Sequence, residues 1–235
     1  MANVLVLGGG FGGLATANAL RAALPAAHGV TVVDDSERFH VGAGKTWIML
    51  GERTFDEISA PRAALLGEGI RLVPARVEAI DVAGRRVVAG GEELAWDHLV
   101  IALGADLDPS LVPGLEDAAH TFYAVAGAER LAAELERFTG GDIVLLIPRA
   151  PFKCPPAPYE AALLLHAALE SRGLADRTRL AVHTVEGAPM ATAGPEMGRY
   201  VEGELAARGI AFHPRRAVER VDGAARRVVF ADGDE

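Results

Sequence analysis

A cluster of glycines directly after a short apolar run limits the folds open to this chain more than any other feature. The run Val4–Leu7 is followed by Gly8–Gly13, in which five of six residues are glycine. A helical pattern then extends from about residue 13 to residue 24, where Pro25 stops it, and a second apolar run covers 30–33. The order strand, tight turn, helix, strand predicts two parallel neighbours in a buried sheet.

Three of these glycines have the spacing G-x-G-x-x-G, and each has a physical task in a dinucleotide-binding turn. Gly8 permits the sharp turn, Gly10 lets the backbone approach a diphosphate, and Gly13 allows the helix to pack closely on the strand. The helix N-terminus adds N–H donors and the positive end of its dipole. We assign the intervening Phe11 and Gly12 to the same site.

An acidic residue stands where this motif needs one. Asp34 ends the second apolar run, 21 residues beyond Gly13. Its carboxylate can accept hydrogen bonds from a ribose diol, and it disfavours a 2′-phosphate. The complete order predicts that the unit binds the ADP half of a dinucleotide, with FAD as the preferred cofactor. A turn that is glycine-rich for packing alone is the alternative.

Composition narrows the classes of partner. Asp and Glu number 32 against 23 Lys and Arg, a net charge of −9 without a basic run, which argues against nucleic acid. Half of the residues are hydrophobic and few are aromatic, as expected for helices packed on a sheet. With no apolar stretch of about 18 residues and no export signal, we expect a cytoplasmic protein, and peripheral attachment to the cytoplasmic membrane stays open.

Strand and helix patterns alternate along the rest of the chain. Expected strands cover residues 70–73, 76–81, 85–89, 99–102, 143–147 and 179–184. Expected helices cover residues 128–138, 159–171 and 195–207. The fold class is therefore α/β, with two Rossmann-like dinucleotide-binding domains. A Pro-rich connection through Pro109 and Pro113 predicts an FAD-binding domain at 1–115 and a second, NAD-type domain at 116–235.

An internal repeat supports the two related domains. Residues 69–88 begin Gly-Ile, carry a proline five positions later and end Arg-Arg-Val-Val, and residues 209–229 have the same pattern. The first copy leads on to the buried strand that ends at Gly104. The second copy reaches Glu235 before the counterpart of that strand, so we expect the second domain to be truncated at its C-terminal end.

A second glycine pair imitates a nucleoside triphosphate loop. Residues 42–46 read Gly-Ala-Gly-Lys-Thr, but Phe39 stands where the loop needs its first glycine, and no strand leads into it. We predict a loop beside the cofactor instead, in which Lys45 faces a phosphate or the flavin edge or is simply solvated.

Further motifs resemble the flavoprotein disulfide reductases with two dinucleotide folds, and within them the sulfide:quinone oxidoreductase and flavocytochrome c sulfide dehydrogenase branch. They are Asp97–Ala105, Pro113–Leu115 and Phe152–Glu160. In such proteins the strand end packs against FAD, which here assigns Ala102 and Gly104 to the cofactor, with Leu103 in place of the usual Thr. The resemblance also places the backbone of Val77 against the adenine.

The second domain departs from pyridine-nucleotide-binding relatives at its turn. Residues 148–156 read Pro-Arg-Ala-Pro-Phe-Lys-Cys-Pro-Pro, and prolines remove N–H donors, so we expect no pyrophosphate site and no use of NADH. Cys154, the only cysteine, lies beside Lys153 and before a Pro-led helix, which favours the thiolate. In the resembled branch this cysteine carries persulfide or disulfide chemistry. Glu160 is either an acid or base near the flavin or a carboxylate that stabilises a helix start.

The resemblance implies an FAD-dependent oxidoreductase that oxidises sulfide through Cys154 and passes electrons to a quinone or cytochrome, with the quinone favoured and a homodimer open. It places a second redox cysteine beyond Glu235, so we expect these 235 residues alone to be inactive. We expect no metal site, because His98, His166, His183 and His213 lack metal-ligand spacing. Two alternatives remain: a type II NADH:quinone oxidoreductase, and a nucleotide-binding or redox-sensing module without turnover.

Overall fold

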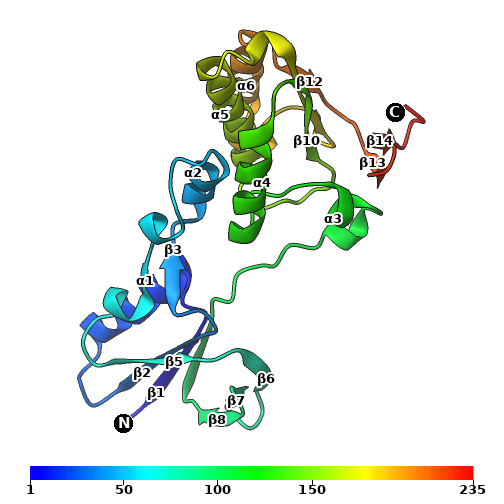
Figure 1. Cartoon of the computed structure of the whole chain (residues 1–235). Coiled ribbons are helices and arrows are strands. Elements are labelled where there is room, and N and C mark those ends of the chain that lie inside the picture. Colours follow the sequence, from blue (N-terminus) through cyan, green and yellow to red (C-terminus); the bar gives the residue numbers. More distant parts are fainter. Residues whose placement is uncertain (235) are drawn as a thin grey trace. The chain divides into compact units, whose positions relative to one another are not determined.

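The computed structural model describes residues 1–234, which form two compact units (Figure 1). Unit 1 comprises Met1–Val41 and Phe55–Asp106, and unit 2 comprises Gly42–Thr54 and Leu107–Glu235. The second unit thus begins nearer the N-terminus than the boundary we predicted after residue 115. The reason is packing: Val112 shares a buried apolar cluster with Val218 and Phe230.

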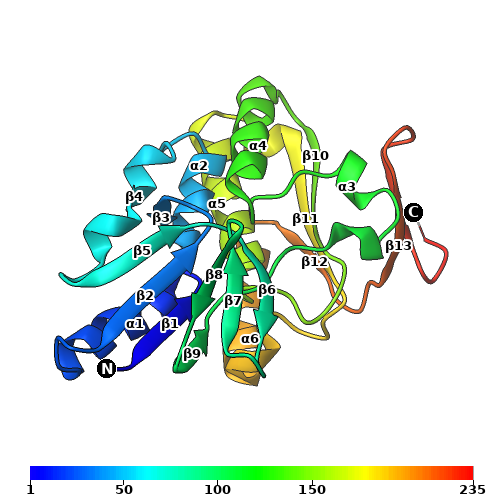
Figure 2. The same ribbon diagram turned by 90° about the horizontal axis from the view of Figure 1, so that it is seen from below.

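Unit 1 is built on a parallel sheet in the order β5-β2-β1-β9 (Figure 2). Its elements are β1 (Asn3–Leu7), α1 (Phe11–Ala23), β2 (Gly29–Asp34), β5 (Ile70–Pro74) and β9 (His98–Ile101). Alternate residues of the strands face opposite sides, so Val6, Val30 and Val32 form one core with Ala17 of α1. This βαβ unit confirms the order read from the glycine cluster.

A small antiparallel sheet covers the other face of the same parallel sheet. It contains β6 (Val77–Asp81), β7 (Arg86–Ala89) and β8 (Glu92–Ala95). Leu5, Leu7 and Val33 of the parallel strands pack there against Val87 and Ala89. The unit also holds the ribbon β3 (Arg38–His40) and β4 (Ser59–Pro61), and the 3-10 helices η2 (Asp56–Ile58) and η3 (Arg62–Leu65).

Unit 2 has a parallel sheet in the order β10-β11-β12. Its strands are β10 (Gly141–Ile147), β11 (Thr178–Thr184), β12 (Ala211–His213) and the hairpin β13 (Val218–Asp222) and β14 (Arg227–Phe230). Its helices are α2 (Lys45–Met49), α3 (Leu115–Ala118), α4 (Val125–Arg137), α5 (Ala157–Ser171) and α6 (Pro195–Ala206), with η1 (Gly42–Gly44), η4 (Pro109–Leu111), η5 (Ala175–Arg177) and η6 (Ala191–Ala193). Helix α2 packs against α4, and α5 packs against β10, β11 and α6.

The repeat seen in the sequence is also a repeat of backbone conformation. Gly69 and Gly209, which precede β5 and β12, have φ values of 81° and 67°. Arg85 and Arg226, at the tips of the β6–β7 and β13–β14 hairpins, have φ values of 52° and 54°, a region that side chains rarely adopt. Both hairpins also carry an irregular register in their first strand. The two segments therefore share one local fold.

A stack of rings beside β11 makes the stability of unit 2 pH-dependent. The ring centroid of His183 lies 4.3 Å from that of His213 and 5.0 Å from that of Phe230. Burial, then the positive charges of His213 and Arg216, lowers the pKa of His183 to about 4. An unfolded histidine titrates near 6.5, so between pH 6.5 and 4 the unfolded chain binds more protons than the folded one.

We expect stability from this group to be complete above pH 6.5 and to be lost as the pH falls toward 4. Because His183 is only half-buried, the loss should be on the order of 1 kcal/mol. The measurement is urea unfolding across this range for the wild type and His183→Phe, which keeps the stack and removes the proton. The variant should lose less stability on acidification, and equal losses would contradict the assignment.

Candidate functional site

The Gly-rich turn joins β1 to α1, and its glycines differ in what surrounds them. Gly8 has a φ of 93°, and a Cβ there would overlap the carbonyl oxygen of Ala102. A Cβ on Gly13 would overlap the carbonyl oxygen of Gly8. A Cβ on Gly10, in contrast, would have no described atom within 4 Å. Gly8 and Gly13 thus serve packing, while the backbone at Gly10 is open to a ligand.

Helix α1 begins in a way that leaves donors for an anion. Gly10 is its N-cap residue, and no side chain of the described residues caps it. The first N–H groups of a helix have no partner inside the helix, and they lie at the positive end of its dipole. Those of Phe11, Gly12 and Gly13 are therefore suited to a diphosphate. Phe11 is exposed, and its ring packs edge-on against Phe39 at 4.9 Å between centroids.

Asp34 ends β2 beside this turn and is already part of a hydrogen-bond network. Its Oδ2 accepts a hydrogen bond from the Gly9 backbone N–H at 2.6 Å. Its Oδ1 accepts one from the Ser36 N–H at 2.9 Å and lies 3.0 Å from Arg62 Nη1. The orientation of the carboxyl group is thus fixed next to the open turn.

Ala102, Gly104 and Val77, which were also assigned to the cofactor, lie in the same unit. The N–H of Ala102 donates to the Leu7 carbonyl at 2.8 Å, which fixes the end of β9 beside the turn. Gly104 follows with a φ of 76° and open space around its α-carbon. Val77 begins β6, shortly after Ala75, whose N–H donates to the Asp34 carbonyl at 3.0 Å. An open turn, an uncapped helix start and an oriented carboxyl group fit the ADP half of FAD.

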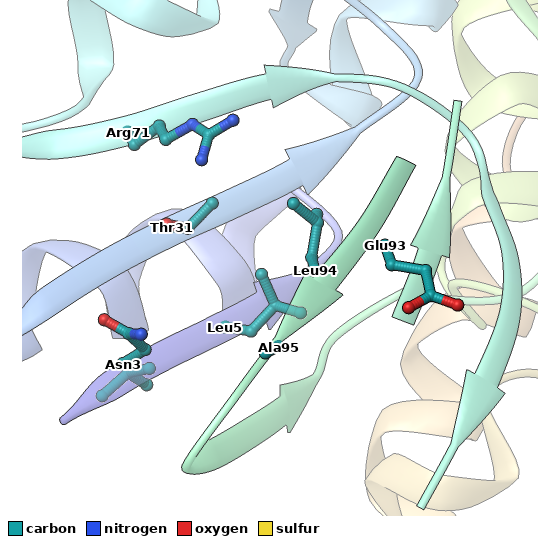
Figure 3. A pocket seen from close by; sticks show the side chains of 8 residues that line it. Asn3, Leu5, Thr31, Arg71, Glu93, Leu94 and Ala95 are labelled. Atoms are coloured by element: carbon teal, nitrogen blue, oxygen red, sulfur yellow. The ribbon is translucent and has the colours of Figure 1, made fainter. Parts of the chain in front are cut away.

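A cavity of about 280 Å³ lies in unit 1 away from this turn (Figure 3). Its lining comes from the first half of β1, from β2 and β5, and from β8, and comprises Asn3, Val4, Leu5, Thr31, Arg71, Glu93, Leu94 and Ala95. The Gly-rich turn follows the opposite end of β1. The cavity is therefore separate from the candidate cofactor site.

The corresponding turn of unit 2 lacks both features that make the first one suitable. Leu7 pairs with Val33 and Ile147 pairs with Thr184. The register position of Asp34 is therefore occupied by Val185, which has no carboxylate. In addition, α1 begins four residues after β1 ends, whereas α5 begins ten residues after β10 ends, and the intervening segment is the Pro-rich one.

Cys154 lies in this replacement segment and is exposed. Its φ of 55° is unusual for a residue with a side chain. The hydroxyl of Tyr123 donates to the Cys154 carbonyl at 3.4 Å, and the Ala157 N–H donates to the same carbonyl at 3.0 Å. Burial, then the negative charge of Cys154, raises the pKa of Tyr123. The backbone of Cys154 is thus fixed while its thiol is accessible.

Lys45 belongs to the surroundings of Cys154, a neighbourhood that the sequence did not indicate. It begins α2, which is part of unit 2. Burial, followed by the positive charge of Lys153, lowers the pKa of Lys45, while the negative charge of Cys154 raises it. Lys45 thus interacts electrostatically with both Lys153 and Cys154. Its neighbour Thr46 is buried and donates to the Ala43 carbonyl at 2.8 Å, unlike the threonine of a phosphate loop.

Two further residues near the start of α5 have different surroundings. Glu160 lies exposed in the first turn of α5, where a carboxylate favours the helix dipole. Tyr159 is fully buried, and its hydroxyl donates to Glu186 Oε2 at 2.8 Å. Burial, then the hydrogen bond to Glu186, raises the pKa of Tyr159. The sequence analysis missed this pair, whose members are 27 positions apart.

The described residues 1–234 contain neither a metal-binding cluster nor a helix that could span a membrane. No group of three or more His, Cys, Asp or Glu side chains there could hold a metal ion. Among the same residues, no helix has the length and apolar character needed to cross a membrane.

Comparison with curated proteins finds relatives that act on quinones according to their names. The sulfide-quinone reductase of Aquifex aeolicus is 30% identical over 213 residues, which cover 87% of this chain and 46% of that protein. The alternative NAD(P)H-ubiquinone oxidoreductase C1 of Arabidopsis thaliana is 31% identical over 210 residues, which cover 79% and 40%. The chain thus spans less than half the length of these relatives.

Solved structures and a family model agree with this result. The sulfide:quinone oxidoreductase of Aquifex aeolicus superposes with a TM-score of 0.87 at 27% identity, covering 100% of this chain and 56% of that one. The model of the pyridine nucleotide-disulphide oxidoreductase family matches residues 2–235. The chain therefore belongs to the pyridine nucleotide-disulphide oxidoreductase family, and within that family it resembles the sulfide-quinone reductases.

Proposed function

We propose that this chain is the cofactor-holding and cysteine-bearing part of an FAD-dependent oxidoreductase that oxidises sulfide and reduces a quinone or a cytochrome. One observation carries the proposal: of two related folds, one keeps an open Gly-rich turn with an acid beside it, and the other replaces the turn with a Pro-rich segment that exposes Cys154. The resemblance to sulfide-quinone reductases supports the substrate and the quinone.

The residues of unit 1 bind and orient the cofactor in this proposal. The N–H groups of Gly10 to Gly13 face the diphosphate, Asp34 accepts from the ribose, and the backbone of Ala102, Gly104 and Val77 lines the site. FAD held by these residues would supply a two-electron acceptor.

Cys154 supplies the sulfur chemistry. Sulfide attacks a sulfur atom bonded to Cys154 in a disulfide or polysulfide, the S–S bond breaks, and Cys154 leaves as a thiolate. Lys45, which interacts electrostatically with Cys154, and the adjacent Lys153 place cationic side chains near that leaving thiolate. Glu160 is the candidate to exchange a proton with the incoming sulfide. In this scheme the protein works at the cytoplasmic face of a membrane, where a quinone is within reach.

The test is the identity of the bound cofactor and of its reductant. We expect the protein purified in its full-length form to release FAD on denaturation and to lose its flavin absorbance when sulfide is added without oxygen. Release of FMN, or no flavin after reconstitution with FAD, would contradict the cofactor assignment. If the flavin stays oxidised after sulfide is added, sulfide is not the substrate.

A type II NADH:quinone oxidoreductase is the second candidate, because a 26% identical relative from Staphylococcus haemolyticus carries that name. The Pro-rich segment and Val185 argue against it. Rapid loss of flavin absorbance with NADH but not with sulfide would favour this candidate. Binding of FAD without reduction by either compound would favour a sensing module without turnover.

A further inference from the structure

A buried guanidinium lies directly behind the Gly-rich turn. Arg62, the first residue of η3, is 5% exposed, and among the described residues it is the only buried one with a charged side chain. It is 53 positions from Gly9 in the sequence and belongs to no motif of the turn. Burying a charged group costs free energy unless the group is paired. The contacts of the Arg62 guanidinium therefore indicate its structural role.

These contacts join the turn to the acid. Arg62 Nε donates to the Gly9 carbonyl at 2.8 Å, and Nη1 lies 3.0 Å from Asp34 Oδ1 and donates to the Ser36 carbonyl. The Gly9 N–H closes the ring by donating to Asp34 Oδ2 at 2.6 Å. Gly9, Asp34 and Arg62 therefore hold one another in place.

The ring also explains why the residue between Gly8 and Gly10 is itself a glycine. A Cβ on Gly9 would overlap Cδ and Nε of Arg62 and would lie 3.3 Å from the Asp34 Cβ. No dinucleotide contact is needed to account for this glycine. The space that a side chain at position 9 would need is occupied by Arg62, which indicates that the turn is built around the guanidinium.

The network leaves Asp34 with limited capacity for a ligand. A carboxylate has roughly four acceptor positions. The Gly9 N–H, the Ser36 N–H and Arg62 occupy three of them. One position remains, on a carboxylate whose orientation is fixed by a charged partner.

We propose that Arg62 is a positioning residue of the nucleotide site, which sets the Asp34 carboxylate so that its remaining acceptor position receives a ribose hydroxyl. This inference rests on the proposed cofactor site. Diphosphate recognition belongs to the Gly10 backbone and the start of α1, so it stays when Arg62 is changed. Only recognition of the ribose is lost.

The experiment measures binding of ADP and of 2′,3′-dideoxy-ADP by calorimetry. The wild type should bind ADP at least about tenfold more tightly than the dideoxy analogue, since a hydrogen bond to a carboxylate is involved. In Arg62→Lys the charge is kept, but one ammonium cannot reproduce the fork to Gly9 and Asp34. The two ligands should then bind within about twofold of each other. Arg86→Lys, at an exposed ion pair of the same unit, is the matched control and should keep the wild-type ratio.

The second variant, Gly9→Ala, displaces the guanidinium from the other side and should lower the ratio in the same way. If Arg62 serves only folding, its substitution should weaken the binding of both ligands equally and leave the ratio of their affinities unchanged. That result would overturn the inference. Loss of all ADP binding in a variant with a wild-type circular dichroism spectrum would also overturn it. If the wild type binds ADP no more tightly than the analogue, the proposed contact to the ribose is wrong. If the wild type does not bind ADP at all, the proposed cofactor site is wrong.

Discussion

Gly13→Ala is expected to destabilise unit 1 severely, whereas Gly10→Ala is expected to fold normally and to bind FAD poorly. The added Cβ of Gly13→Ala would overlap the Gly8 carbonyl, a backbone atom that cannot rotate away. Overpacking of this kind costs about 3 kcal/mol or more. The Cβ of Gly10→Ala would meet no described protein atom within 4 Å, but it would project into the space from which a diphosphate reaches the backbone.

Thermal unfolding and FAD titration separate these two effects. Gly10→Ala should melt within a few degrees of the wild type and lose at least about tenfold in FAD affinity, because the helix N–H groups are no longer approachable. Gly203→Ala is the matched control: this exposed glycine of α6 also has no described atom near its added Cβ. It should be neutral or slightly stabilising, with FAD affinity unchanged. Unchanged FAD affinity in Gly10→Ala would contradict the assignment of this turn to the cofactor.

In the full-length form of the protein, Cys154→Ser should abolish reduction of the bound flavin by sulfide. A serine hydroxyl is close in size to a thiol but cannot form or exchange an S–S bond, so the rate should fall by at least about 10³-fold. Because the side chain is exposed, the variant should unfold at the wild-type temperature and keep its FAD. Stopped-flow absorbance of the flavin after mixing with sulfide measures the rate.

Lys153→Met provides a graded comparison for this result. It removes the cationic side chain next to Cys154 but leaves the sulfur, so sulfide should still reduce the flavin, more slowly than in the wild type. A Cys154→Ser variant that is reduced at the wild-type rate would show that the sulfur chemistry takes place elsewhere. In that case the cofactor site would be unaffected.

The sequence predicted those parts of the fold that depend on neighbouring residues. The glycine spacing, the apolar runs and the acid at the strand end predicted β1, α1 and β2 because turn and sheet contacts link nearby positions. The repeat predicted two related domains, and the positive φ shared by Arg85 and Arg226 shows that the two repeated segments have the same local conformation. All of these features depend on residues that are close to one another in the sequence.

Contacts between distant positions were not predictable in the same way. Arg62 reaches Gly9 and Asp34 through an irregular stretch with β4 and η3, and nothing in its immediate neighbours marks it as buried. The sequence predicted a loop at residues 42–46 beside the cofactor, but it did not predict that the packing of α2 on α4 would group this segment with unit 2. Both features depend on side-chain packing between positions far apart in the sequence, which local sequence patterns do not reveal.

A crystal structure of the protein grown with both FAD and NADH tests most directly whether only one of the two related turns holds a nucleotide. We predict a single dinucleotide, with its diphosphate against Gly10 and the start of α1 and its ribose at Asp34. A nicotinamide dinucleotide bound over Pro148–Pro156, with the Cys154 thiol remote from any flavin ring, would contradict the account.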